Sequence, residues 1–305
     1  MKPVRLLLGL GLAVGLSAGP SWGYEEVPVP DGGTLQGMVK LIGKVPKPKG
    51  YNLVTLPDAV YCGRISTGTG WRLLQPFVID SNGGFKNVVI YIEELRKGKS
   101  FDYVPPRIEA VDCKFEPYIT IVRDRHDVEV VNMDPVFHDI QGYETSKFGA
   151  RVLFNVPLPM SKKLRKAELL AGKTVKDRAG KVLTQPIKMG KQRNLFVMQC
   201  GFHAYMESWG FAVKNPYYAL SAKDGSYAIS DVPPGTYKVQ VWHPMVRREY
   251  TVTITPNGTT DLQIEIDAPK GRLYANEVSE GTRFGLELLG DVAIKPIVER
   301  QTYEP

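Results

Sequence analysis

The sequence predicts an all-β protein that contains two β-sandwiches. Runs of β-branched and aromatic residues recur between turns rich in Gly, Pro and Asn, and only one short segment has helical spacing. The chain has 305 residues, of which 43% are hydrophobic and 23% charged, so it is long enough for about two globular domains. This composition excludes a disordered chain, collagen and a multi-span membrane protein.

The predicted strands follow these runs along the chain. They cover residues 34–42, 85–92, 118–122, 127–131, 151–155, 194–200, 209–214, 227–229, 236–242, 249–255 and 260–266. The last three alternate most clearly: Tyr237, Val239 and Val241 should face a core, whereas Gln240 and Trp242 should face water. Asn257-Gly258 predicts a hairpin between the last two strands.

The N-terminus has the pattern of a secretory signal peptide at residues 1–23. Lys2 and Arg5 precede an uncharged run, and small residues lead to a cleavage site after Gly23. The run is too short for a membrane anchor, and no later segment could span a bilayer. We therefore expect a periplasmic or extracellular protein without a transmembrane span in its mature form.

Positive charge is concentrated in residues 158–193, which we expect to be an insertion between strands. The formal net charge is +7, or about +5 without the leader, which is too weak to predict nucleic-acid binding. Ser161 could cap a short helix there that Gly172 ends. The segment is either a solvated loop or a docking surface for an acidic protein or anionic lipid. The candidate docking residues are Lys162, Lys163, Arg165, Lys166, Lys173 and Lys176.

Three cysteines in an exported chain leave at least one without an internal disulfide partner. Cys62 and Cys113 are the expected pair, because both stand beside turn-forming or polar residues, whereas Cys200 lies among His and Met residues. Two alternatives stay open: three free thiols, or a disulfide of Cys200 with one of the others.

Metal-ligating residue types gather around Cys200. Cys200, His203 and Met206 have C-x2-H-x2-M spacing, which suits a loop between two strands, and His138 follows an upstream strand. Two His, one Cys and one Met are the ligands of an electron-transfer copper site, although the thiolate would also bind zinc. His126 and His243, the remaining histidines, are interpreted as surface residues at a turn and a strand end.

The N-x-D-P-x-x-H motif at residues 132–138, followed by Cys200, His203 and Met206, resembles the cupredoxin family, and its loop spacing resembles the amicyanin group. The resemblance covers about residues 105–215. It implies a Greek-key sandwich with one type 1 copper ion held by His138, Cys200, His203 and Met206. Two features depart from the family: Asp139 replaces its usual Asn, and the basic insertion lengthens the interval between the first two ligands.

A second resemblance surrounds this unit. The segments 222–227 and 231–239 resemble the carboxypeptidase regulatory-like family, a transthyretin-like sandwich, and residues 37–39 and 87–91 fit its opening strands. We expect a discontinuous sandwich of residues 34–98 and 216–267, into which the cupredoxin-like unit is inserted. Two consecutive domains are the alternative. Residues 268–305 are interpreted as a tail.

The expected function is one-electron transfer by a copper protein, through the exposed edge of a ligand imidazole, most favourably His203. The partner would be an acidic redox protein such as a cytochrome. Copper sequestration or delivery, and a metal-free surface or carbohydrate-binding module, are the alternatives. We expect no catalytic activity, because the sequence has no G-x-S-x-G, Walker A or H-E-x-x-H motif.

Overall fold

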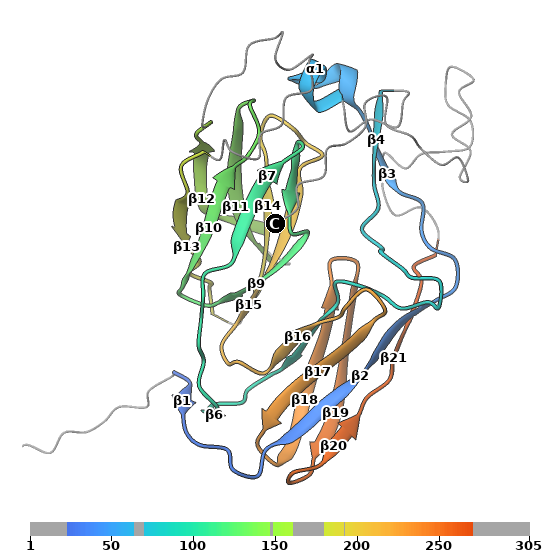
Figure 1. The fold of residues 1–305 in the computed structure, drawn as a ribbon, viewed down its shortest axis with the longest axis vertical. Helices are drawn as coiled ribbons and strands as arrows, with labels where there is room; N and C mark the ends of the chain where they lie inside the picture. The colour runs from blue at the N-terminus through green and yellow to red at the C-terminus, as the bar shows by residue number, and fades with distance from the viewer. Residues whose placement is uncertain (1–22, 64–69, 147–148, 161–179, 192, 271–305) are drawn as a thin grey trace, which may run out of the picture.

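The protein is described by a computed structural model over residues 23–63, 70–146, 149–160, 180–191 and 193–270, and this part is all-β, as predicted (Figure 1). Its helical elements are η1 (Leu53–Thr55) and α1 (Ala59–Cys62). No helix in the described part is both long and apolar enough to cross a membrane. The predicted leader up to residue 22, and the tail from residue 271, lie outside the described residues.

One sandwich comprises the middle of the chain. Its first sheet has the order β12-β11-β14-β15-β9, and its second has the order β13-β10-β7-β8. The strands are β7 (Arg107–Val111), β8 (Lys114–Glu116), β9 (Ile119–Arg123), β10 (Asp127–Asn132), β11 (His138–Ser146), β12 (Gly149–Leu158), β13 (Leu183–Pro186), β14 (Leu195–Gln199) and β15 (Glu207–Val213). Side chains from both sheets, such as Val130 and Phe196, form one buried core.

The second sandwich combines strands from both sides of the first. One sheet has the order β16-β5-β18-β19, and in the other β2 pairs with β17, β20 and β21. The strands are β2 (Gly33–Ile42), β5 (Val89–Ile92), β16 (Tyr218–Leu220), β17 (Ser226–Val232), β18 (Gly235–His243), β19 (Val246–Ile254), β20 (Thr259–Asp261) and β21 (Ile264–Asp267). The early strands β2 and β5 therefore share sheets with the late strands.

The turn at Asn257-Gly258 does not make the predicted hairpin. The predicted strand 260–266 is divided into β20 and β21, and both pair in parallel with β2 of the opposite sheet. In this position Ile264 and Ile266 are buried in the core of the second sandwich. The turn signal was correct, but local sequence does not determine which sheet the next strand joins.

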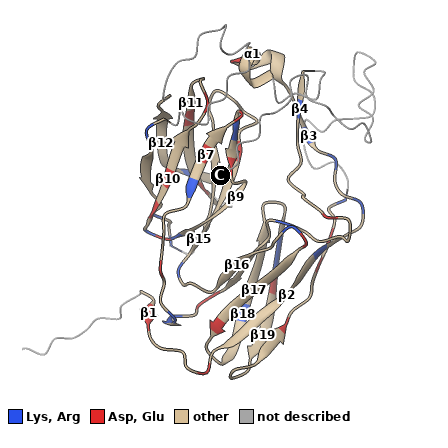
Figure 2. Ribbon diagram, in the orientation of Figure 1, with Lys and Arg blue, Asp and Glu red and all other residues tan. Residues whose placement is uncertain are grey.

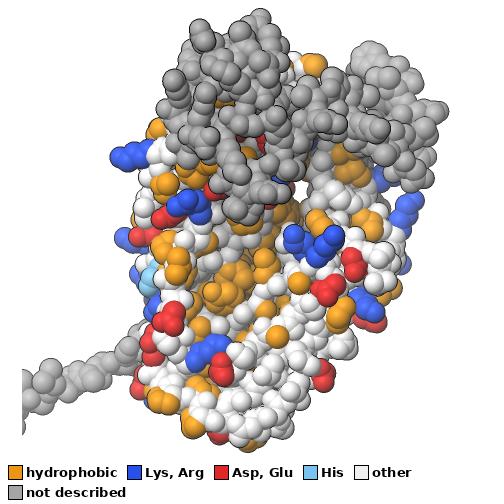
Figure 3. Space-filling view, viewed as in Figure 1, with side chains coloured by type: hydrophobic (Ala, Val, Ile, Leu, Met, Phe, Trp, Pro, Cys, Tyr) orange, Lys and Arg blue, Asp and Glu red, His pale blue; other side chains and the backbone are white. Residues whose placement is uncertain are grey.

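An apolar interface joins the two sandwiches. It contains Val89, Tyr91 and Trp242 from the second sandwich and Ile119, Phe211 and Val213 from the first, together with Phe101 from the connection that leads to β7. Figure 3 shows hydrophobic side chains gathered along this seam. The prediction that Gln240 and Trp242 face water is therefore wrong: Trp242 is only 4% exposed because the other sandwich covers this face of β18.

A long connection between β2 and β5 reaches over the first sandwich. It contains a hairpin of β3 (Lys49–Asn52) and β4 (Trp71–Leu74), with η1 and α1 between them. A disulfide joins Cys62 of α1 to Cys113, in the turn between β7 and β8. Residues 53–62 are called the cap below. A further short pair, β1 (Glu25–Glu26) with β6 (Lys97–Gly98), holds the start of the described chain.

The basic segment is only partly described. The candidate docking residues and the helix expected after Ser161 fall within 161–179, outside the described residues. The rest of the segment is not simply a loop, because β13 pairs with β10 and extends a sheet. In the described part, basic and acidic residues are interspersed over both sandwiches (Figure 2).

Candidate metal centre

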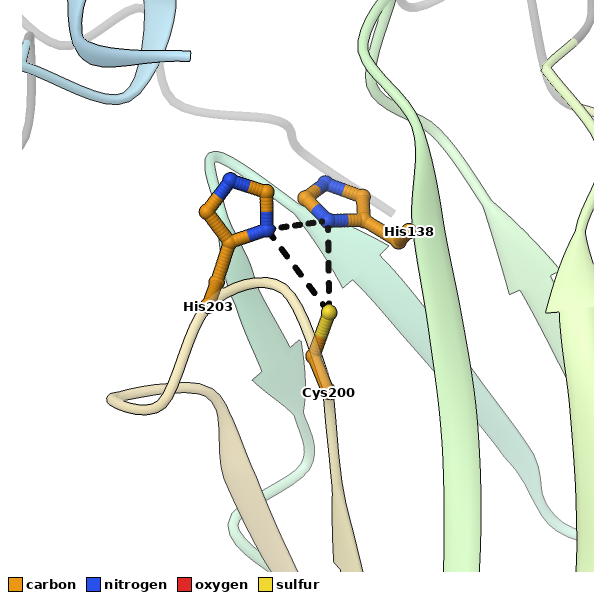
Figure 4. A group of neighbouring side chains, drawn as sticks. All are labelled: His138, Cys200 and His203. Atoms are coloured by element: carbon orange, nitrogen blue, oxygen red, sulfur yellow. Dashed lines mark hydrogen bonds between the residues drawn. The ribbon is translucent and has the colours of Figure 1, made fainter. Parts of the chain in front are cut away.

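Three of the four predicted ligands meet at one end of the first sandwich. His138 begins β11, and Cys200 directly follows β14, its antiparallel neighbour. His203 and Met206 lie in the loop that leads to β15. Figure 4 shows the side chains of His138, Cys200 and His203 pointing toward one another. Two adjacent strands and one loop thus bring together residues that are far apart in the sequence.

The three ligand atoms form a triangle of metal-binding size. The two Nδ1 atoms lie 3.2 Å apart, and Cys200 Sγ lies 3.6 Å from His203 Nδ1 and 4.0 Å from His138 Nδ1. These sides place one point in their plane about 2.1 Å from all three atoms, close to the roughly 2.0–2.3 Å of metal–nitrogen and metal–sulfur bonds. The triangle therefore fits an ion without movement of the backbone.

Hydrogen bonds fix the ligand loop. The Met206 amide donates to the His203 carbonyl at 2.8 Å, and the Cys200 amide donates to the Met206 carbonyl at 3.2 Å. Met206 is fully buried in the same apolar cluster as Cys200. Its thioether is the candidate for a fourth, soft ligand.

Asp139 links the two ligand-bearing segments. Its Oδ1 accepts a hydrogen bond from the Gly201 amide at 2.6 Å, and its Oδ2 accepts one from Gln141 Nε2. A Cβ at position 201 would lie 2.5 Å from Gln141 Nε2 and 3.0 Å from Asp139 Oδ2. A larger residue at position 201 would therefore displace the side chains of Gln141 and Asp139. Asp139, which departs from the cupredoxin pattern, thus connects the Cys200 loop to β11.

The N-x-D-P segment before His138 is a buried turn. The Asp134 amide donates to Asn132 Oδ1 at 2.8 Å, while Asn132 Nδ2 donates to the carbonyls of Val136 and Leu158. Asn132 and Asp134 are both buried, so these bonds satisfy groups that water cannot reach. The turn sets the position at which His138 enters β11.

The far nitrogen of each imidazole faces acceptors. His138 Nε2 lies 2.9 Å from Asp134 Oδ2. His203 Nε2 lies 3.5 Å from Asp58 Oδ2, with the Pro57 carbonyl also beside it. These partners favour a proton on Nε2 of both rings, because carboxylates and carbonyls only accept. Both Nδ1 atoms are then left with lone pairs directed at the same point.

The expected exposed imidazole edge is absent from this site. His138 and His203 are both 0% exposed. The cap covers His203, and Cys62 Sγ lies 3.8 Å from His203 Nε2. Figure 4 shows the end of α1 above the imidazoles. The prediction that an edge of His203 is exposed is therefore wrong. Nothing in the sequence of the connection between β2 and β5 indicated that it would fold over the ligands.

Burial also sets the protonation of the metal-free site. It raises the pKa of the Cys200 thiol to about 11. Burial and the neighbouring His138 lower the pKa of His203, so its imidazole is neutral near pH 7. A metal must displace the Cys200 proton, and metal affinity should rise with pH.

Three residues outside the predicted ligand set have contacts that the sequence did not indicate. His243, interpreted as a surface residue, is buried, and its Nε2 lies 3.2 Å from the Pro76 carbonyl; burial lowers its pKa to about 4. Asp58 contacts a ligand histidine although nothing in its local sequence marks it. Asp134 belongs to the N-x-D-P motif, but the motif alone did not indicate its bond to His138.

The family model that matches the chain is the one described as polysaccharide lyase family 4, domain II, over residues 194–262. This range includes the Cys200 loop and strands β14 to β20, and it is less than half of the chain. No curated protein matches the sequence.

Solved cupredoxins share similarity with part of the chain. A purple cupredoxin from Nitrosopumilus maritimus is 15% identical and covers 35% of this chain and 99% of its own, with a TM-score of 0.25. Reduced auracyanin from Roseiflexus castenholzii is 9% identical over 37% of this chain and 99% of its own (TM-score 0.24), and amicyanin from Paracoccus versutus is 11% identical over 41% and 97% (TM-score 0.23). At these low scores, the case for a metal site rests on its geometry.

Proposed function

We propose that this protein binds one copper ion through His138, Cys200, His203 and Met206 and uses it as a one-electron carrier. The observation that carries the proposal is the contact between the two Nδ1 atoms at 3.2 Å. Because acceptors beside both Nε2 atoms favour protons there, the two Nδ1 atoms carry lone pairs that repel each other beside the buried Cys200 thiol. A metal cation at their common point turns that repulsion into coordination.

The donor set favours copper. The thiolate of Cys200 and the thioether of Met206 are soft ligands, and a weak axial Met beside a His2Cys set is typical of electron-transfer copper sites rather than zinc sites. Bound copper would supply a couple between Cu(II) and Cu(I). The predicted type 1 site remains a proposal, because ligand identity alone does not choose the metal.

The chain's own residues would keep the site rigid. Asp139 holds the Cys200 loop to β11, the turn at Asn132 positions His138, and the cap keeps solvent from His203. A rigid, dry site limits the rearrangement that accompanies a change of charge. We further propose export to the periplasm or cell surface, an acidic redox partner such as a cytochrome, and no catalytic activity. The carboxypeptidase regulatory-like assignment of the second sandwich stays a prediction.

Copper sequestration or delivery is a second candidate, favoured by the complete burial of both imidazoles. A carrier must cycle without losing its ion, whereas a delivery protein must release it. Voltammetry of the copper-loaded chain, with a Cu(I) chelator in solution, separates these functions. We expect a reversible one-electron wave that survives the chelator. A wave that disappears as the chelator removes Cu(I) would instead indicate delivery.

Met206→Leu provides a matched control, because it keeps the volume of the side chain but removes the thioether. We expect this variant to retain copper and to have a shifted midpoint potential. If neither protein binds copper, the metal-free surface module is the remaining function.

A further inference from the structure

Asp134 has hydrogen-bond partners on both carboxylate oxygens, and three of these four contacts are buried. Oδ1 accepts from the Asp112 amide at 2.8 Å and from the Tyr61 hydroxyl at 3.0 Å. Oδ2 accepts from the Cys113 amide at 2.8 Å and lies 2.9 Å from His138 Nε2. This side chain is 1% exposed. The ionised carboxylate, which only accepts, fits these partners and leaves His138 Nε2 as a fourth donor.

Asp58 stands in the same relation to the other ligand imidazole. It comes from the cap, and its Oδ2 lies 3.5 Å from His203 Nε2. Its side chain is 38% exposed, so water screens its charge more than that of Asp134. The disulfide at Cys62 fastens this part of the cap to the turn at Cys113, whose amide binds Asp134. The two carboxylates thus belong to one connected support around the ligands.

From this arrangement we infer that Asp134 and Asp58 are positioning residues that fix both imidazoles with Nδ1 toward the metal and favour the oxidised ion. This inference rests on the proposed copper site. A carboxylate on the far nitrogen orients the ring and makes it a stronger donor. Together with the Cys200 thiolate, and with Asp139 on the Cys200 loop, the two carboxylates place negative charge around the site. They stabilise Cu(II) more than Cu(I), because the attraction grows with the charge of the ion.

The test compares Asp134→Asn and Asp58→Asn with the unaltered chain. Both variants should have a higher midpoint potential, and Asp134→Asn should shift it more because Asp134 is buried. The affinity for Cu(II) should fall about 10- to 100-fold in Asp134→Asn, the usual effect of losing such a partner. The affinity for Cu(I) should fall less. Unchanged potentials in both variants would overturn the inference.

Two control variants separate charge from packing. Tyr61→Phe removes one hydrogen bond to Asp134 without changing its charge, and Asp80→Asn removes a carboxylate that accepts backbone hydrogen bonds in the second sandwich. Neither should raise the potential as Asp134→Asn does. An equal rise in Tyr61→Phe would show that loosened packing, rather than charge, sets the potential. If Asp134→Asn does not fold, Asp58→Asn on the half-exposed cap still tests whether loss of a carboxylate raises the midpoint potential.

A copper-independent measurement distinguishes failure of this inference from failure of the proposed function. In the metal-free protein, nitrogen-15 NMR of the imidazoles should show the proton of His138 on Nε2, and Asp134→Leu should lose that preference. If the chain binds no copper but shows this tautomer, the copper function fails and the positioning role stands. A proton on Nδ1 of His138 in the unaltered chain would overturn the role of Asp134.

Discussion

Trp242 of the second sandwich packs against Phe211 of the first, with ring centroids 5.4 Å apart. Both side chains are buried because each sheet covers the other, so the interface is part of the apolar core rather than a mobile hinge. Removal of the indole leaves a cavity between the sandwiches.

Trp242→Ala should therefore lower the free energy of unfolding by about 3–5 kcal/mol. It should also uncouple the sandwiches, so that calorimetry resolves two transitions where the unaltered chain shows one. A single transition with an unchanged midpoint would contradict a stabilising role for this interface. Val104→Ala, at a residue that is 83% exposed, is the control and should leave the midpoint in place.

The disulfide between Cys62 and Cys113 closes a stretch of 51 residues. In the loop-entropy account, its loss in the double variant Cys62→Ala/Cys113→Ala should cost about 4 kcal/mol of stability. The cap should also loosen over His203. Modification of histidine by diethyl pyrocarbonate, followed by mass spectrometry, should detect His203 in the variant but not in the unaltered chain. His243, buried in the second sandwich, should stay protected in both; equal protection of His203 would show that the cap needs no disulfide.

Glu144 should make stability depend on acidic pH. Burial alone would raise its pKa, but hydrogen bonds from Arg151, the Gly190 amide and Arg193 outweigh burial and lower the pKa to about 2. A carboxyl whose pKa is lower in the folded chain stabilises the fold above its unfolded pKa of about 4.5, and this contribution is lost as the pH falls toward 2.

Glu144→Gln should accordingly destabilise the chain by about 3 kcal/mol at pH 7, and the difference should shrink between pH 4.5 and pH 2. Urea unfolding at a series of pH values measures it. A difference that stays constant over this range would mean that the ion pairs of Glu144 contribute nothing through ionisation. Glu109→Gln, at a half-buried position on β7, provides a comparison.

The sequence was most informative where function and fold depend on local spacing. C-x2-H-x2-M places its residues in one loop, so Cys200, His203 and Met206 could be grouped without knowledge of the fold. Alternation identified β18 and β19 because each has a face in its own core. The strand β11 was not predicted, since His138–Ser146 mixes polar residues with few β-branched ones along a partly buried strand.

Long-range features could not be predicted from spacing. Asp58 and Cys62 reach His203 from a segment whose residues have no clear periodicity, and only the tertiary fold brings the cap over the site. Trp242 was predicted to face water, because alternation shows only which side of a strand faces the core of its own sandwich. It does not show that a second sandwich covers the other side. The carboxylates behind the ligand imidazoles were missed for the same reason.

The most direct test of the metal site is titration of the metal-free chain with Cu(II), followed by visible absorption, beside Cys200→Ser. The triangle of His138, Cys200 and His203 predicts saturation at one equivalent and an intense thiolate-to-copper charge-transfer band, which the serine variant should lack. Colourless binding at one equivalent, identical in both proteins, would contradict a copper–thiolate bond. No binding in the unaltered chain would contradict the metal site itself.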